Sequence, residues 1–263
     1  MMRVAALVQA AWDPVSVEVD PVSGAIDRAR AAAAASPGSL EAVELALTLG
    51  EAHVVGLDGP DVEALLRDCL ALGAASVVAA TDVYAVAEAM AADPFDLVLV
   101  PHRSGDHGAS PVAGLLAGLL DLPQATAAES VAVEGREARV VSRLDRGVRE
   151  ELAVPLPAVV AVEPGIVRPR AASPAALIGA RSAVVPRLPP AVRAPGPAFL
   201  DHRPPRPGPP RMPAPAGTLP AEARIAAVVG AATEARQREL VTGSADEVAR
   251  RIVELLEAAG YLG

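Results

Sequence analysis

The residue types of a hydrolytic triad stand close together in one short stretch of the chain. Ser104, Asp106 and His107 supply a hydroxyl, a carboxylate and an imidazole within four positions. A triad draws these groups together from separate segments, and near neighbours on one loop rarely converge in that way. His102 and His107 with Asp106 match no standard metal-binding spacing. We therefore predict solvated loop residues here, with no catalytic residue and no metal site.

Phosphate-binding chemistry has no sequence fingerprint in this chain. The segment after the first apolar run reads Gln9-Ala10-Ala11-Trp12-Asp13-Pro14, so the Gly-x-Gly-x-x-Gly turn of dinucleotide-binding proteins is absent. The chain contains no lysine, which excludes a P-loop lysine and a Schiff-base lysine. Aromatic residues make up only 2% of the chain, so it is poorly equipped to hold a flavin ring by itself.

The composition is that of a globular protein with an acidic surface. The chain has 263 residues, of which 52% are hydrophobic, enough for a substantial core. Its net charge of −9 argues against a nucleic-acid partner, because phosphate binding needs a dense cationic surface. Cys69 is the single cysteine, which indicates a reducing compartment. Without a signal-peptide pattern or an apolar stretch of about 18 residues, we expect a cytoplasmic protein with no membrane insertion.

Short apolar runs alternate with amphipathic runs through the first half of the chain. Strands that are apolar on both faces and separated by helices are typical of a parallel sheet. The fold class is therefore α/β, with an open, mostly parallel sheet of the adenine-nucleotide-binding type and helices on both faces. The expected strands are residues 4–8, 53–57, 76–80 and 96–100, and the expected helices are residues 36–49, 60–72, 82–92 and 109–120.

In the second half of the chain, the residue pattern predicts strands without helices between them. We expect these to be antiparallel strands added to the edge of the sheet. A helix near residues 174–181 then closes a first domain of residues 1–182. The expected additional strands are residues 131–135, 138–144, 148–154 and 158–162.

A proline-rich tether and a helical arm follow the first domain. Twelve prolines fall between residues 186 and 215, which predicts a linker over residues 183–220. In the arm, residues 221–263, we expect a helix from 221 to 238. Ser244-Ala245-Asp246-Glu247 then forms a capping box for a helix that runs to Ala259. A tethered helix cannot bury its apolar face alone, so the arm should dock on a partner or fold back.

A crevice at the carboxyl ends of the strands is the expected ligand site, because open parallel sheets bind ligands where the strand order reverses. The loop after the first strand and the loop of residues 101–110 would form it. The second loop contains two glycines and leads into a helix whose free N–H groups could hold a phosphate. A loop that only needs tight turns explains the glycines equally well.

The order of these segments resembles the β subunit of electron transfer flavoproteins, over almost everything except residues 182–220. The segments that match the family pattern are Ser36 to Glu44, Cys69 to Ala74, Phe95 to Leu99, Leu122 to Thr126, Pro155 to Val160 and Arg168 to Ala171. We expect a divergent bacterial branch, with a peptide-derived redox cofactor system such as mycofactocin as one candidate setting.

The resemblance implies a non-catalytic subunit that carries electrons from a dehydrogenase donor to a downstream acceptor. It would form a heterodimer with an α subunit that holds most of the FAD, and the β subunit could bind AMP. The cofactor-binding candidates are Leu7, Val8, Gln9, Trp12, Ser36, Asp58, Asp106, His107, Ser110, Val112 and Ala113. The partner-docking candidates are Arg168, Arg170, Pro174 and Leu177.

The chain departs from the family pattern at positions that matter for binding. Ser110-Pro111-Val112-Ala113 replaces the Asn-Gln-Thr-Gly that holds the AMP phosphate, so AMP would depend on Ser110 and main-chain N–H groups alone. Pro174 replaces the leucine that anchors redox partners, which makes Leu177 the nearest candidate anchor. Trp12 is a candidate substitute for the family's tyrosine after the first strand.

Two other functions remain open. The first is a stand-alone adenine-nucleotide-binding regulator that resembles universal stress proteins, which share this sheet topology. The second is an enzyme of the adenine-nucleotide hydrolase superfamily. The antiparallel addition and the tethered arm disfavour the regulator, and the lack of a Ser-Gly-Gly phosphate loop, of lysine and of clustered acids disfavours the enzyme.

Overall fold

The computed structural model describes residues 2–20, 27, 30–105, 108, 110–191, 220–229 and 243–258. The chain divides into two compact units, residues 1–195 and residues 196–263.

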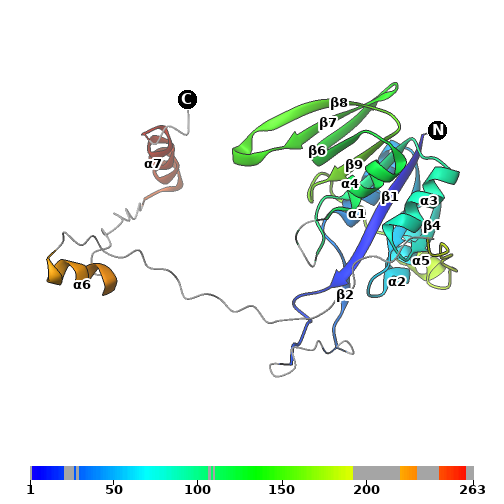
Figure 1. The fold of residues 1–263 in the computed structure, drawn as a ribbon, viewed down its shortest axis with the longest axis horizontal. Helices are drawn as coiled ribbons and strands as arrows, with labels where there is room; N and C mark the ends of the chain where they lie inside the picture. The colour runs from blue at the N-terminus through cyan, green and yellow to red at the C-terminus, as the bar shows by residue number, and fades with distance from the viewer. Residues whose placement is uncertain are drawn as a thin grey trace. The chain divides into compact units, whose positions relative to one another are not determined.

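The first unit is built on a nine-stranded sheet, whose main path runs β4-β3-β1-β5-β9-β6-β7-β8 (Figure 1). The strands from β4 to β6 along this path are parallel to one another, whereas β6, β7 and β8 are antiparallel, and β2 pairs with β1 in an antiparallel way. The strands are β1 (Arg3–Trp12), β2 (Ala33–Ala35), β3 (Glu51–Leu57), β4 (Ser76–Ala80), β5 (Leu97–Pro101), β6 (Gln124–Glu134), β7 (Glu137–Arg143), β8 (Arg149–Pro155) and β9 (Ala158–Val162).

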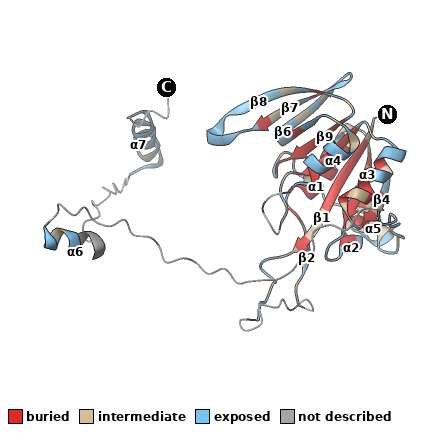
Figure 2. Ribbon diagram, viewed as in Figure 1, coloured by how far each residue is buried: buried red, intermediate tan, exposed pale blue. Residues whose placement is uncertain are grey.

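Helices cover both faces of the parallel part of the sheet, and the strands between them are buried (Figure 2). One core cluster joins the sheet to α1 and α2 through Val43, Leu66 and Cys69. The other joins it to α3 and α4 through Val86 and Leu116. The helices are α1 (Ser39–Leu49), α2 (Val62–Leu72), α3 (Val83–Ala92), α4 (Val112–Leu120) and α5 (Pro174–Ala180). A single 3₁₀ turn, η1 (Asp145–Gly147), joins β7 to β8.

This architecture confirms the predicted α/β fold class with antiparallel strands at one edge, and it corrects three details. β9 is a parallel strand inside the sheet, between β5 and β6, because all five of its residues are apolar and buried on both faces. β1 runs on to Trp12 and pairs with β2, a short alanine strand that the sequence did not indicate. α1 begins at Ser39, because Gly38 before it adopts a left-handed conformation with φ of 85°.

The start of the expected proline-rich linker is attached to the first unit. Ala79 of β4 donates a hydrogen bond to the carbonyl of Pro186 and accepts one from the N–H of Leu188, both at 2.8 Å. The guanidinium of Arg187 contacts the carboxylates of Asp58 at 3.1 Å and Glu63 at 3.7 Å. This stretch therefore pairs with the outer edge of β4.

The second unit contains α6 (Ala221–Val229) and α7 (Ala245–Ala258). The predicted capping box is confirmed at α7: the Ser244 hydroxyl accepts from the Glu247 N–H at 3.4 Å, and Glu247 accepts from the Ser244 N–H at 2.8 Å. The continuation of α6 to residue 238 and the end of the last helix at Ala259 lie outside the described residues. None of the helices that the structure describes has the length and apolar character needed to cross a bilayer.

Candidate functional site

The strand order reverses at β1, which lies between β3 and β5. The chain passes from β1 to β3 on one side and later returns to β5 on the other. The crevice predicted from the sequence therefore lies beyond the carboxyl ends of β1 and β5.

Two buried serines tie the end of β1 to the segment that enters α1. The Ser39 hydroxyl accepts from the Gln9 N–H at 3.1 Å and donates to the Gln9 carbonyl at 3.3 Å, and the Ser36 N–H donates to the same carbonyl at 2.8 Å. The Ser36 hydroxyl also accepts from the N–H of Gly105, in the loop after β5, at 3.3 Å. The segments that border the crevice are thus hydrogen-bonded to one another.

Two glycines allow these segments to approach so closely. A Cβ on Gly38 would lie 3.3 Å from the carbonyl oxygen of Val162, and the φ of 85° there is itself unfavourable for other residues. A Cβ on Gly105 would lie 2.9 Å from the Cβ of Ala11 and 3.1 Å from the hydroxyl of Ser36. The sequence indicated glycines in the loop after β5, but it did not distinguish close approach from a simple turn.

The groups that could hold a nucleotide phosphate here belong mainly to the main chain. Pro111, the N-cap of α4, provides no side-chain hydrogen bond to the first turn of the helix. The Ser110 hydroxyl accepts from the Val112 N–H at 3.4 Å. The side-chain oxygen of Gln9 is buried and has no hydrogen-bond partner. These groups fit a phosphate at the N-terminus of α4 and a hydrogen-bond donor near Gln9.

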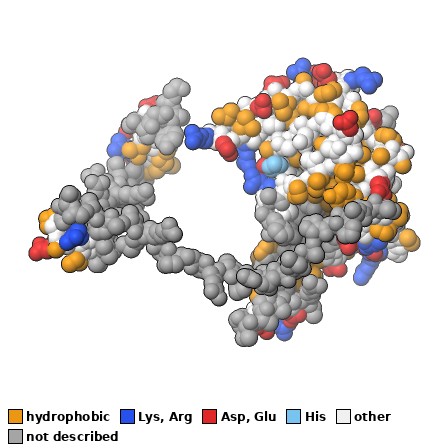
Figure 3. All heavy atoms as spheres, viewed as in Figure 1, with side chains coloured by type: hydrophobic (Ala, Val, Ile, Leu, Met, Phe, Trp, Pro, Cys, Tyr) orange, Lys and Arg blue, Asp and Glu red, His pale blue; other side chains and the backbone are white. Residues whose placement is uncertain are grey.

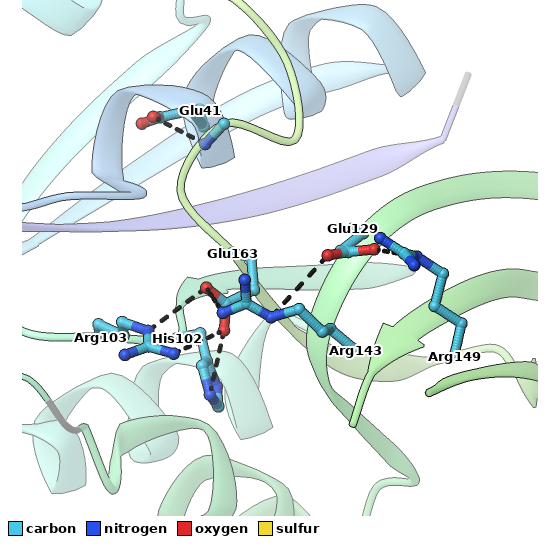
Figure 4. A network of polar contacts seen from close by, with 8 residues as sticks. Glu41, His102, Arg103, Glu129, Arg143, Arg149 and Glu163 are labelled. Carbon is cyan, nitrogen blue, oxygen red and sulfur yellow. Dashed lines mark hydrogen bonds and ion pairs between the residues drawn. The ribbon is translucent and has the colours of Figure 1, made fainter. Parts of the chain in front are cut away.

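A polar network that sequence reasoning missed lies at the same edge of the sheet (Figure 4). Glu163 directly follows β9, and only 8% of its side chain is exposed. Its carboxylate contacts the side-chain nitrogens of three cationic or titratable residues: His102 at 3.5 Å, Arg103 at 3.3 Å and Arg143 at 3.3 Å. The one sequence signal was an acidic residue at the end of a fully apolar strand.

Comparison with known proteins decides the family. The model of the electron transfer flavoprotein domain matches residues 23–192. The chain belongs to the electron transfer flavoprotein domain family. It is 26% identical over 162 residues to the electron transfer flavoprotein subunit beta of Thermoanaerobacterium thermosaccharolyticum. This match covers 56% of this chain and 62% of that protein.

A second relative is a subunit of a larger complex. The chain is 26% identical over 174 residues to the caffeyl-CoA reductase-Etf complex subunit CarD of Acetobacterium woodii. This match covers 59% of this chain and 66% of that protein. The matches thus span just under two thirds of the length of both curated relatives. The predicted family is confirmed, at low identity.

The cofactor-binding candidates of this electron transfer flavoprotein domain fall into four groups. Leu7 and Val8 are fully buried within β1, where they support the sheet. Asp58, after β3, forms an ion pair with Arg187 at 3.1 Å. The candidates at the crevice itself, at or next to the ends of β1, α1 and α4, are Gln9, Trp12, Ser36, Ser110, Val112 and Ala113. Asp106 and His107 lie outside the described residues.

Among the docking candidates, Arg170 is held internally. Its guanidinium donates two hydrogen bonds to the carboxylate of Glu44 on α1, at 2.7 and 2.8 Å, and its N–H donates a third at 3.0 Å. These hydrogen bonds hold the pKa of Glu44 below its usual range. The pair fixes the segment before α5 and leaves Arg170 less available to a partner.

Of the other docking candidates, Arg168 is exposed in the segment before α5, and Pro174 and Leu177 belong to α5. Pro174 opens this helix, and Ser173 caps it by accepting from the Ala176 N–H at 3.1 Å. Leu177 is 41% exposed and lines a cavity of about 530 Å³ between α2, β2 and the segment before α5. Ile178, which the sequence analysis did not single out, is more exposed, at 74%.

Proposed function

We propose that this chain is the β subunit of a heterodimeric electron transfer flavoprotein and completes an FAD site held mainly by an α subunit. The observation that carries this proposal is the family match over residues 23–192, which covers every strand of the sheet except β1, together with α5. Both curated relatives are named as subunits, one of an electron transfer flavoprotein and one of an Etf complex.

The residues at the crevice support a shared cofactor site. In the described part of the crevice, Trp12 is the one aromatic side chain, and a flavin ring is usually held by stacking and convergent polar groups. The flavin, when bound, would supply the electron transfer chemistry, and this chain would supply positioning and the exclusion of water. The hydrogen bonds of Ser36 and Ser39 suit that role, because they fix the loops around the crevice.

AMP is a second ligand proposed for this subunit. The N-terminus of α4 offers main-chain N–H groups to a phosphate, with the Ser110 hydroxyl beside them. The described residues at this helix end, Ser110 to Ala113, include no cationic side chain. Recognition would therefore depend on the helix end and on the shape of the crevice.

Electrons would enter and leave through docked redox partners, a dehydrogenase donor and a downstream acceptor. The side chains around α5 are suited to docking, because Leu177 and Ile178 are exposed apolar groups on a helix that is fixed by the Arg170–Glu44 pair. No catalytic group of this chain takes part, since the redox chemistry belongs to the flavin.

Co-expression tests this proposal. The chain would be produced with a flavoprotein α subunit from the same genome and purified through a tag on this chain. We expect a yellow one-to-one complex, and equilibrium dialysis should show that this chain alone retains little FAD. A colourless monomer that binds ATP would instead support the nucleotide-binding regulator, and turnover of a substrate by the chain alone would exclude an electron-carrier subunit.

A further inference from the structure

The network around Glu163 is a local concentration of positive charge on an acidic protein. Arg103 and Arg143 contact Glu163, and Arg143 and Arg149 contact Glu129 at 3.8 and 2.7 Å (Figure 4). Three arginines therefore surround two glutamates, whereas the chain as a whole carries a net charge of −9. Figure 3 shows that acidic and basic side chains lie close together along the antiparallel strands of the visible face.

Glu163 uses only some of the donors of the two arginines. Arg103 donates to its carboxylate through Nε at 3.3 Å and Nη2 at 3.5 Å, and Arg143 contacts it at 3.3 Å, compared with 2.7 Å in the Arg170–Glu44 pair. Each guanidinium carries five N–H donors in a planar fork, so most donors are not used by Glu163. The two side chains remain 46% and 44% exposed. They can therefore accept a further anion without leaving Glu163.

The position of the buried carboxylate explains why the arginines stay in place. Glu163 is fixed at the end of β9 by its N–H, which donates to the carbonyl of Ala128 at 2.9 Å. Arg103 comes from the loop after β5 and Arg143 from the end of β7. One buried anion thus orients cations from two segments toward the edge of the sheet that also bears the crevice.

We propose that Arg103 and Arg143, oriented by Glu163, form a docking site for a carboxylate side chain of the flavin-bearing partner subunit. A guanidinium binds a carboxylate through two parallel N–H donors, which makes this ligand the best match in shape and charge. The rest of this acidic chain would repel an acidic patch on the partner, whereas the two arginines would attract it. This difference would orient the partner during the encounter. The inference rests on the proposed heterodimer.

Charge reversal at Arg143 tests the docking site, with Arg139 as a matched control. Arg139 lies on the same strand, four residues away and on the same face, and it also contacts two carboxylates, Glu134 at 2.7 Å and Glu151 at 3.4 Å. The dissociation constant for the purified flavin-bearing partner subunit would be measured at low and raised salt. We expect Arg143→Glu to weaken binding about tenfold or more at low salt, and Arg139→Glu to change it less than about twofold.

Further variants and conditions keep the outcomes distinct. Arg143→Lys keeps the charge but loses the planar fork, so its affinity should fall between those of the unmodified chain and Arg143→Glu. Arg143→Gln repeats the test if the glutamate variant does not fold. Equal affinities for the Arg143→Glu variant and the unmodified chain would overturn the docking site, as would equal losses for Arg143→Glu and Arg139→Glu. Inorganic phosphate at millimolar concentration provides a further check. If phosphate binds Arg103 and Arg143 in the absence of the partner and its binding is unaffected by the partner, the cluster is a small-anion site and the docking site is overturned. If the unmodified chain does not bind the partner at all, the proposed heterodimer itself is wrong.

Discussion

The ion pair between Glu44 and Arg170 connects two parts of the chain that are 126 residues apart. The Glu44 side chain is only 11% exposed, and its carboxylate accepts three hydrogen bonds from Arg170. A buried carboxylate without such partners would be strongly disfavoured as an anion. The hydrogen bonds reverse that effect and lower the pKa of Glu44, so the folded state depends on the charged form.

The stabilisation from Glu44 should therefore depend on pH. Because its pKa is lower in the folded state, the contribution is fully present above the unfolded-state value of about 4.3 and is lost as the pH falls through the folded-state pKa. We expect Glu44→Gln to lower the urea midpoint at pH 7, and we expect this difference to shrink at pH 3. Urea unfolding of both proteins at the two pH values measures it. Glu41→Gln, on the same helix, serves as control, because among the described residues Glu41 accepts one hydrogen bond, from the Gly165 N–H at 3.3 Å.

Residue pairs of this kind mark the limit of what the sequence could predict. The crevice residues Gln9 and Ser36 could be placed, because each lies at the end of a strand or helix that the apolar pattern already indicated. The contacts of Glu163 with Arg103 and Arg143 could not, since they depend on the position of β9 within the sheet. Arg170 was predicted to face a partner, and its internal pairing with Glu44 became visible only in the structure.

At the scale of elements, the turn before α1 determines how closely this helix approaches the crevice. Gly38 has a φ of 85°, and its Cα faces the carbonyl of Val162 and the ring of Pro101. We expect Gly38→Ala to destabilise the fold by about 1–2 kcal/mol for the left-handed backbone alone. The contact of the new Cβ with Val162 at 3.3 Å should add to that cost. Denaturant unfolding gives the total.

Gly147→Ala separates the two causes. Gly147 has a similar φ of 80°, but a Cβ there would meet nothing within 4 Å. This variant should therefore lose only the backbone contribution. If Gly147→Ala is destabilised as much as Gly38→Ala, close packing at the crevice does not add to the requirement for glycine at position 38.

The elements themselves were largely predictable, and the exceptions have physical causes. The five residues Ala158–Val162 are all apolar, which is typical of a strand inside a parallel sheet, but their position directly after two antiparallel strands suggested an edge. The alanines of β2 carry no β-strand signal, since alanine is depleted in strands, and only pairing with the end of β1 organises them. By contrast, the capping box at Ser244 is a local signal, and it located the start of α7 correctly.

At the scale of the whole molecule, the two units differ in how they bury apolar surface. The first unit encloses two clusters of hydrophobic side chains between the sheet and the helices. α7, in the second unit, carries apolar side chains that remain between 37% and 50% exposed: Ile252, Val253, Leu255 and Leu256. A helix with one apolar stripe and an otherwise charged surface is stabilised mainly by packing against another surface. The proposed α subunit is the surface we expect this stripe to contact.

This expectation leads to a prediction about assembly. Ile252 and Leu255 lie one turn apart on one face of α7, whereas Arg250 lies close to the opposite face at 100° per residue. We expect the double substitution Ile252→Ser and Leu255→Ser to weaken the complex with the α subunit at least tenfold, because two buried apolar side chains contribute about 3 kcal/mol or more. Arg250→Ser should leave the affinity within about twofold. Titration of each variant with the α subunit measures both. Equal affinities for the double variant and the unmodified chain would show that the arm, residues 221–263, does not dock through α7.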